Sequence, residues 1–226
     1  MNKSNEVIKG FLINLQNTDQ LWESNALVEI DWREYDEDVV HYFNDMMDEP
    51  IGIKTVSNGK AYGDDIVLKN GDKELQIPYG DEQDRDVTIK YFNDFVQPDY
   101  EVRWFAESLG NDTLGFTVLS GAEWAKLDDE FGADTVRYYF EPIDFESDRF
   151  NLGMDEVFAL LALRENSEGV NTQFSTQLDW IRIINKEKTL AEQKENGQID
   201  LKQYMVAKKE LQQSKDDFIA AHGPMK

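Results

Sequence analysis

The chain has 226 residues and no cysteine, and 46 acidic against 23 basic side chains give it a formal net charge of −23. This composition excludes disulfide bonds, thiol nucleophiles and thiolate metal sites, and it disfavours nucleic-acid binding, which needs clustered basic side chains. The start shows no signal-peptide pattern, and no stretch of 18 apolar residues is present to span a membrane. With 40% hydrophobic residues the chain is too apolar for a disordered acidic tail, so we expect a folded cytoplasmic protein.

Helices and strands are expected to alternate through the first hundred residues. Apolar residues recur every three or four positions in the predicted helices and every second position in the predicted strands. In chain order we expect a helix over 5–16, a strand over 26–32, a helix over 39–48 that ends before Pro50, strands over 51–56, 65–69 and 74–78, and a helix with Ile89, Phe92, Phe95 and Val96 inward. Asn58-Gly59 and Asn70-Gly71 lie at two of the connections and indicate hairpins.

The next segment begins with a predicted hairpin. Strands are expected over 100–107 and 115–119. Ser120 and Glu123 then have the spacing of a capping box, which predicts a helix that ends at Gly132. We expect a further strand over 136–140 and a strongly apolar helix over 154–164.

One four-residue string occurs twice. Tyr42-Phe43-Asn44-Asp45 recurs as Tyr91-Phe92-Asn93-Asp94, 49 residues later, each time in a predicted helix between two predicted strands. A chance match explains this in a chain rich in these residue types. The alternative is a duplicated strand–helix–strand unit, which favours a mostly antiparallel sheet with helices on one face.

The C-terminal segment has a different composition, rich in Lys, Gln, Glu and helix formers. Apolar stripes predict two helices joined at Asn196-Gly197; they are formed by Phe174, Leu178, Ile181 and Ile184, and by Leu201, Tyr204, Leu211 and Phe218. Gly197, Ile199, Tyr204, Lys208 and Leu211 have a spacing that resembles the short C-terminal helical module SHOCT, over about residues 186–213. The resemblance implies a docking or oligomerisation hairpin without chemistry, and a simple antiparallel helix pair would give much the same pattern. No family resemblance is assigned to residues 1–172.

Charge divides the chain into the same two parts. Residues 1–150 have 34 acidic and 13 basic side chains, whereas residues 151–226 have 12 and 10. We therefore predict an acidic α+β domain over 1–165, with a mostly antiparallel sheet and packed helices, and a helical C-terminal extension over 173–222.

No catalytic residue, metal ligand set or cofactor is predicted. The two histidines, His41 and His222, lie on a polar helix side and in the terminal tail. Asp144, Glu146 and Asp148 have the spacing of a calcium loop, but Arg149 stands where the turn needs glycine. Asp128-Asp129-Glu130 is interpreted as an exposed acidic helix face, and no glycine-rich phosphate loop or serine-hydrolase motif occurs.

Acidic residues interleaved with aromatic ones are the remaining signal. Carboxylates steer and pair with a basic partner, and Tyr or Trp side chains anchor interfaces. The predicted binding residues are Asp31, Glu34, Tyr35, Asp36, Glu37, Asp38, Asp45 and Asp48. Tyr35 is the expected exposed anchor, whereas the alternation with Ile30 predicts that Trp32 is buried.

Three functions follow as hypotheses. The first is an acidic non-catalytic protein that neutralises or regulates a basic protein, in the manner of an immunity protein against a nuclease-type toxin or a nucleic-acid mimic. The second is an adaptor or oligomeric structural protein that docks or self-associates through its C-terminal helices. The third is a hydrolase or lyase that uses carboxylates and a divalent cation. The first requires neither direct nucleic-acid binding nor a membrane.

Overall fold

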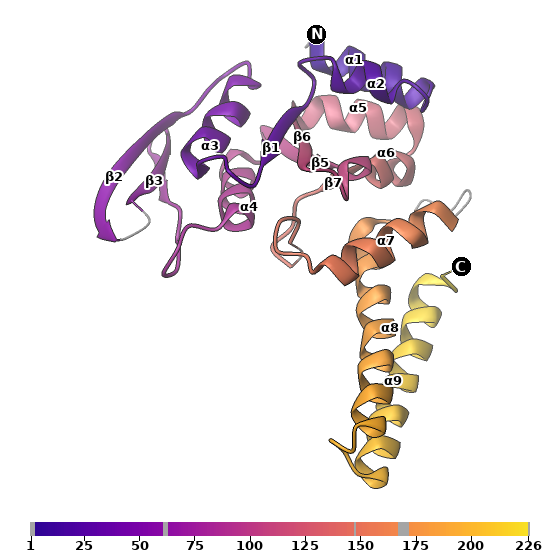
Figure 1. The fold of residues 1–226 in the computed structure, drawn as a ribbon. Coiled ribbons are helices and arrows are strands. Elements are labelled where there is room, and N and C mark those ends of the chain that lie inside the picture. Colours follow the sequence, from indigo (N-terminus) through magenta and orange to yellow (C-terminus); the bar gives the residue numbers. More distant parts are fainter. Residues whose placement is uncertain (1–2, 61–62, 147, 167–171, 226) are drawn as a thin grey trace. The chain divides into compact units, whose positions relative to one another are not determined.

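The computed structural model describes residues 3–60, 63–146, 148–166 and 172–225 (Figure 1). The fold is α+β, as the sequence predicts, with two antiparallel sheets, packed helices and a C-terminal helical pair. The chain forms two compact units, Met1–Asn151 and Leu152–Lys226. Among the described helices, none is long and apolar enough to cross a membrane.

A four-stranded sheet forms the centre of the first unit. Its order is β1 (Val28–Asp31), β6 (Thr113–Ser120), β5 (Tyr100–Phe105) and β7 (Phe140–Pro142), with every neighbour antiparallel. Strand β6 is buried at every position from Leu114 to Leu119. Continuous burial along a strand means that both faces of the sheet are covered, so the expectation of helices on one face is wrong.

Two groups of helices cover these two faces. Four helices lie on the first face: α1 (Lys3–Ile13), α2 (Thr18–Trp22), α5 (Gly121–Phe131) and α6 (Ala133–Tyr139). Phe11 of α1 meets Phe105 of β5 edge to face at 5.4 Å in this layer. On the other face Phe116 of β6 contacts Phe43 at 5.9 Å between ring centroids. Phe43 belongs to α3 (Asp36–Asp45), which packs beside α4 (Arg85–Val96).

The second sheet contains three strands, in the order β2 (Gly52–Lys60), β3 (Gly63–Asn70) and β4 (Lys73–Gln76). Helices α3 and α4 connect it to the first sheet, since α3 follows β1 and precedes β2, while α4 follows β4 and precedes β5. Asn70-Gly71 connects β3 to β4 as predicted, with Gly71 at φ 58°. Asn58-Gly59 instead lies inside β2, where the register with β3 shifts.

The repeated string lies in α3 and in α4, two helices that occupy equivalent places between the strands of the two sheets. In the first sheet β6 lies between β1 and β5, and in the second β3 lies between β4 and β2. The order strand–helix–strand–strand therefore occurs twice, as β1-α3-β2-β3 and β4-α4-β5-β6. In each run the first strand pairs with the last strand of the other run. The prediction of a strand before and after each copy is confirmed.

The predicted strand over 136–140 is wrong. Residues Ala133–Tyr139 form α6, and only Phe140 belongs to a strand, β7. The capping box at Ser120 and the end of α5 at Gly132, with φ 87°, are both as predicted. Helix α6 starts directly after Gly132, because Val136 N–H donates to its carbonyl at 3.0 Å. A short apolar run does not distinguish helix from strand by its period alone.

The second unit consists of α7 (Met154–Asn166), α8 (Phe174–Glu195) and α9 (Leu201–His222). The predicted helical hairpin is confirmed, with Gly197 at φ 66° in its connection. Helix α7, expected within the acidic domain, groups with the hairpin. Its Arg164 donates to Gln177 of α8 at 3.3 Å, and its Glu156 pairs with Arg182 of α8 at 3.1 Å.

Candidate acidic binding site

One guanidinium group organises the segment that contains most of the predicted binding residues. Arg85 Nε donates to Asp36 Oδ1 at 2.6 Å, while its Nη1 donates to the Asp31 carbonyl at 2.7 Å and its Nη2 donates to the Glu34 carbonyl. Asp36 is 5% exposed, and its second oxygen accepts from Thr88 Oγ1 at 2.8 Å. Asp36 therefore anchors the start of α3 and does not present its charge to a partner.

Two further predicted residues have local roles. Asp31 Oδ1 accepts from the Arg33 N–H at 2.7 Å, which turns the chain after β1. Glu34 accepts from the Tyr42 hydroxyl at 3.3 Å. Desolvation and the nearby Glu34 charge raise the pKa of Tyr42 above its ordinary value, so this hydroxyl stays protonated and able to donate. Asp31 and Glu34 are both half-buried.

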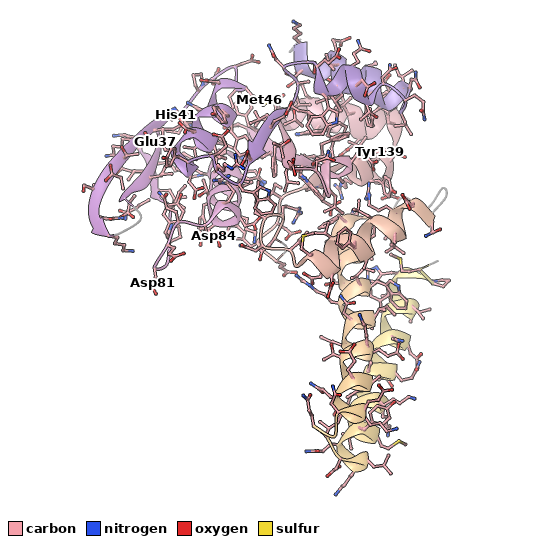
Figure 2. The ribbon with its side chains drawn as sticks, in the orientation of Figure 1. Glu37, His41, Met46, Asp81, Asp84 and Tyr139 are labelled. Atoms are coloured by element: carbon pink, nitrogen blue, oxygen red, sulfur yellow. The ribbon has the colours of Figure 1, made fainter. Side chains whose placement is uncertain are left out.

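The other predicted acids follow helix α3. Glu37, His41 and Asp45 are exposed and lie one helical turn apart, so they share one face of α3; Figure 2 labels the first two. Asp38 is half-buried beside them, and Asp48 is exposed just beyond the helix. The acidic side chains in the first turn interact favourably with the helix dipole. Asp45 lies at the C-terminal end of α3, where the dipole disfavours a negative charge.

Two aromatic side chains stand out from this segment. Tyr35 is 76% exposed, as predicted, and Trp32 is 60% exposed, so the prediction that Trp32 is buried is wrong. Strand β1 ends at Asp31, and the inward alternation ends with it. The Trp32 ring meets Phe150 edge to face, with centroids 5.5 Å apart and planes at 87°. This contact packs one part of the indole against Phe150 and leaves most of its area exposed to solvent.

A pocket of about 370 Å³ opens beside Trp32. We call it the acidic–aromatic pocket; its lining residues are Trp32, Asp36, Glu82, Gln83, Asp84, Arg85, Phe150 and Asn151. The one cation in this lining is Arg85, whose donors are bonded to Asp36 and to the carbonyls of the 31–34 segment. Glu82 is exposed at the pocket, and Figure 2 shows Asp81 and Asp84 on the loop that leads into α4.

Hydrogen bonds fix the far wall of the pocket. Asp84 accepts from the Val87 N–H at 3.1 Å as the cap of α4, and its other oxygen accepts from Asn151 Nδ2 at 3.0 Å. Asp86, 3% exposed, accepts from the backbone N–H groups of Arg149, Phe150 and Asn151. Burial raises the pKa of Asp86 although these bonds oppose the shift. The wall is therefore held in place by bonds within the chain itself.

Six of the eight lining residues of this pocket lie outside the segment that the sequence indicated. Glu82, Asp84, Arg85 and Phe150 lie far from residues 31–38 in the chain, and only folding brings them beside Trp32. A signal was present in the acidic stretch 81–86 before a helix, which is typical of a capped helix start. No pattern in the sequence indicates that Arg85 bonds to the 31–36 segment.

Four of the carboxylates considered for chemistry have partners within the protein. Asp148 accepts from Lys90, and Asp144 accepts from the Glu146 N–H at 2.8 Å. On α5, Asp128 pairs with Arg103 at 3.4 Å and Glu130 with Lys9 at 2.7 Å. Within the described residues no three Asp, Glu or His side chains converge in a group that could hold a metal ion.

The resemblance of residues 186–213 to the SHOCT module remains a prediction. No family model, curated protein or solved structure matches this chain.

Proposed function

We propose that this chain is a non-catalytic binding protein that holds and regulates a basic protein partner. The acidic–aromatic pocket would receive a cationic side chain of that partner, and the acidic face of α3 would steer the approach. A nuclease or toxin with a basic cleft is the class of partner that such a surface suits, with both proteins in the cytoplasm. The partner would then be inhibited because its cleft is occupied.

The observation on which the proposal depends is the combination of an open indole with carboxylates around a preformed pocket. The face of a Trp ring attracts Lys and Arg side chains, and this attraction strengthens as water is excluded. Glu82 at the pocket and Glu37 on α3 are exposed, so they are able to pair with a cation. Arg85 does not take the place of the partner's cation at Glu82 or Glu37, because its hydrogen bonds to Asp36 and to the carbonyls of Asp31 and Glu34 are made within the protein.

The charge of the first unit supports the same proposal. Residues 1–150 have an excess of 21 acidic side chains, which attracts basic surfaces over long range and speeds encounter at low salt. Selecting one basic partner among many needs a concave, rigid binding surface in addition to this long-range electrostatic attraction. The wall fixed by Asp84 and Asp86 provides that feature, so we expect few hot-spot residues around Trp32.

Calorimetric titration with an oligo-arginine peptide tests the pocket directly. The full chain is compared with Trp32→Ala and with the double reversal Glu37→Lys/Glu82→Lys. A matched control, Asp72→Lys/Asp129→Lys, makes the same charge change at exposed acids away from the pocket. We expect Trp32→Ala to weaken binding about tenfold, and the pocket reversal to weaken binding more than its control does.

The same four proteins then serve as baits in lysate of the source organism, eluted with rising salt. A dedicated partner is one basic protein that the wild type and the control reversal retain and both pocket variants lose. If the two reversals weaken peptide binding equally and Trp32→Ala has no effect, the charge is a general coat and the pocket assignment is wrong. Asp36 is unsuitable for reversal, because a lysine there would be buried against Arg85.

A further inference from the structure

Few side chains of the helical hairpin in the second unit are buried, although its two helices are long. Helices α8 and α9 have 22 residues each, yet within α9, all of which is described, only Phe218 is buried. The buried residues of α8 are confined to its first eight positions, Phe174 to Ile181. From residue 183 to residue 217, all described, no side chain is buried. Long helices in water obtain most of their stability from packing. The contacts of this outer half with α7 and between α8 and α9 bury none of its side chains, so it has room for a further packing partner.

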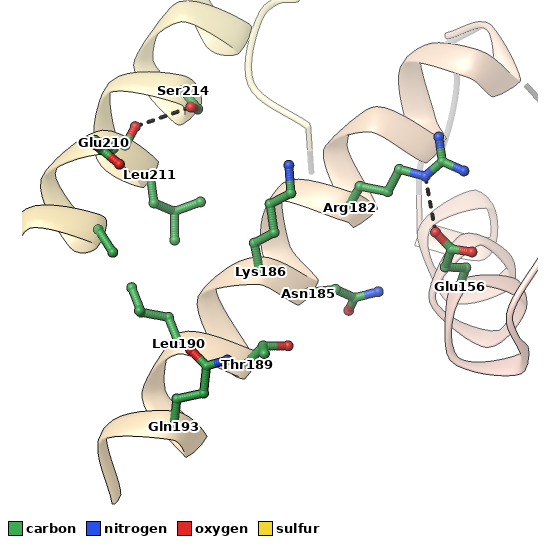
Figure 3. Close-up of a pocket in the computed structure, with 11 residues that line it drawn as sticks. Glu156, Arg182, Asn185, Lys186, Thr189, Leu190, Gln193, Glu210, Leu211 and Ser214 are labelled. Carbon is green, nitrogen blue, oxygen red and sulfur yellow. Dashed lines mark hydrogen bonds and ion pairs between the residues drawn. The ribbon is translucent and has the colours of Figure 1, made fainter. Parts of the chain in front are cut away.

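A groove marks the face where that partner would pack. It has a volume of about 590 Å³ and runs between α8 and α9, with Leu190, Ala207 and Leu211 in its lining (Figure 3). Figure 3 shows Leu190 and Leu211 extending toward each other from the two helices. Both leucines remain half-exposed, and with Ala207 they form an unfilled apolar seam within a groove whose other lining residues are polar or charged.

The charges around the groove favour a second copy of this chain as its occupant. Lys186 lines it from α8 and Glu210 lines it from α9, while Arg182 of α8 is paired with Glu156 of α7 at the groove's end. In a twofold contact the same surface meets itself, and with the axis parallel to the helices Lys186 of one copy would lie on the side of Glu210 of the other. Residues 174–222 hold eight basic and eight acidic side chains, so two hairpins approach without net repulsion.

The neutral hairpin contrasts with the rest of the molecule. The excess of 21 acids in residues 1–150 makes two copies repel each other everywhere except at a neutral surface. A strongly basic or acidic occupant would gain no attraction from a groove that presents both signs. We propose that two copies associate through this groove, packing α8 and α9 of each copy into a four-helix bundle.

Sedimentation equilibrium of the full chain at about 150 mM salt tests the proposal, because at that ionic strength repulsion between the acidic domains is largely screened. We expect twice the mass of one chain. We also expect self-association to strengthen as salt rises, which is opposite to the salt dependence of binding to a basic partner. A chain that stays monomeric up to about 100 μM overturns the proposal, since a specific interface is expected to bind more tightly than that.

Single cysteines locate the interface, because the chain has none of its own. Ala207→Cys places a thiol in the groove, and Val206→Cys places one at the adjacent position, 55% exposed and outside the groove lining. With a short flexible bis-maleimide linker, we expect Ala207→Cys to give at least a several-fold higher yield of covalent dimer. Equal yields, or a higher yield from Val206→Cys, would mean that the copies meet through another face.

Leu211→Glu adds a variant that opposes association. We expect it to weaken self-association at least about tenfold, since a charge would be buried in the seam. Val206→Glu is the matched control and is expected to leave the dimer intact. Circular dichroism of both variants checks that the helices persist. A folded Leu211→Glu that dimerises like the wild type contradicts the proposed groove.

Discussion

Asp36 and Arg85 begin two equivalent helices, 49 residues apart in the sequence, and their side chains pair with each other, Nε to Oδ1, at 2.6 Å. Both side chains are largely buried, at 5% and 11% exposure. The pair joins the two strand–helix–strand–strand runs at the point where the acidic–aromatic pocket begins. Its integrity therefore affects both the stability of the first unit and the shape of the proposed site.

Breaking this ion pair is expected to be costly. Arg85→Ala leaves Asp36 as a buried charge without its main partner, and we expect a loss of about 3 kcal/mol in the free energy of unfolding, measured by urea titration. Glu130→Ala is the control, because the Lys9–Glu130 pair is exposed and is expected to contribute less than about 1 kcal/mol. Equal losses from the two variants would contradict the structural role of Arg85.

The two asparagines of the repeated string are expected to be equivalent in stability as well as in position. Asn44 bonds to both the N–H and the carbonyl of Ile51, at 2.7 and 3.0 Å. Asn93 accepts from the Val102 N–H at 2.8 Å and donates to the Ile143 carbonyl at 3.2 Å. Each therefore ties a helix to the segment that follows or packs against it.

Asn44→Ala and Asn93→Ala should each destabilise the protein by about 2 kcal/mol, because buried backbone groups lose their partners. Asn111→Ala, at an exposed turn position, should change the free energy of unfolding by less than about 0.5 kcal/mol. Chemical denaturation of the three variants measures this. A loss at only one of Asn44 and Asn93 would show that the copies differ in function within the fold.

The stability of the first unit should depend on pH through Asp86. Burial raises the pKa of this carboxyl group, so the folded state binds its proton more tightly than the unfolded state does. The contribution of Asp86 to stability is therefore complete below the pKa of the unfolded chain, and it is lost as pH rises through the raised pKa of the folded state. Lowering the pH from 7 is expected to favour the wild type over Asp86→Asn.

Urea unfolding at a series of pH values, for wild type and Asp86→Asn, measures this difference. The general loss of negative charge at low pH acts on both proteins and cancels in the comparison. Asp112→Asn removes a charge at an exposed turn and serves as the control. A difference between wild type and Asp86→Asn that stays constant with pH would contradict a shifted titration at Asp86.

Salt should separate the two proposed interactions. Binding of a basic peptide at the acidic–aromatic pocket is expected to weaken between about 10 and 150 mM salt, as screening shortens the reach of the acidic field from about 30 to 8 Å. Self-association through the hairpin groove is expected to strengthen over the same range. Calorimetry and sedimentation on the same preparation measure both. Parallel responses to salt would mean that one of the two surfaces has been assigned wrongly.

Much of the architecture follows from the sequence alone. Periodicity placed α1, α3, α4 and the helical hairpin, because a helix that buries one face needs apolar residues at fixed spacing. Ser120 and Glu123 located the start of α5, since a capping box depends on residues only three positions apart. The segment Val136–Tyr139 was mistaken for a strand because its apolar run is too short to show a period.

The site, by contrast, depends on contacts between distant residues. The sequence identified the acidic and aromatic character of residues 31–48, and Tyr35 is exposed as expected. It did not reveal that Asp36 forms a buried ion pair with Arg85 or that the Trp32 ring is exposed to solvent. Burial and pairing arise from segments that meet only after folding. Local spacing fixes which residues can form a helix or cap. Only the packing of separate segments decides which charges remain available to a partner.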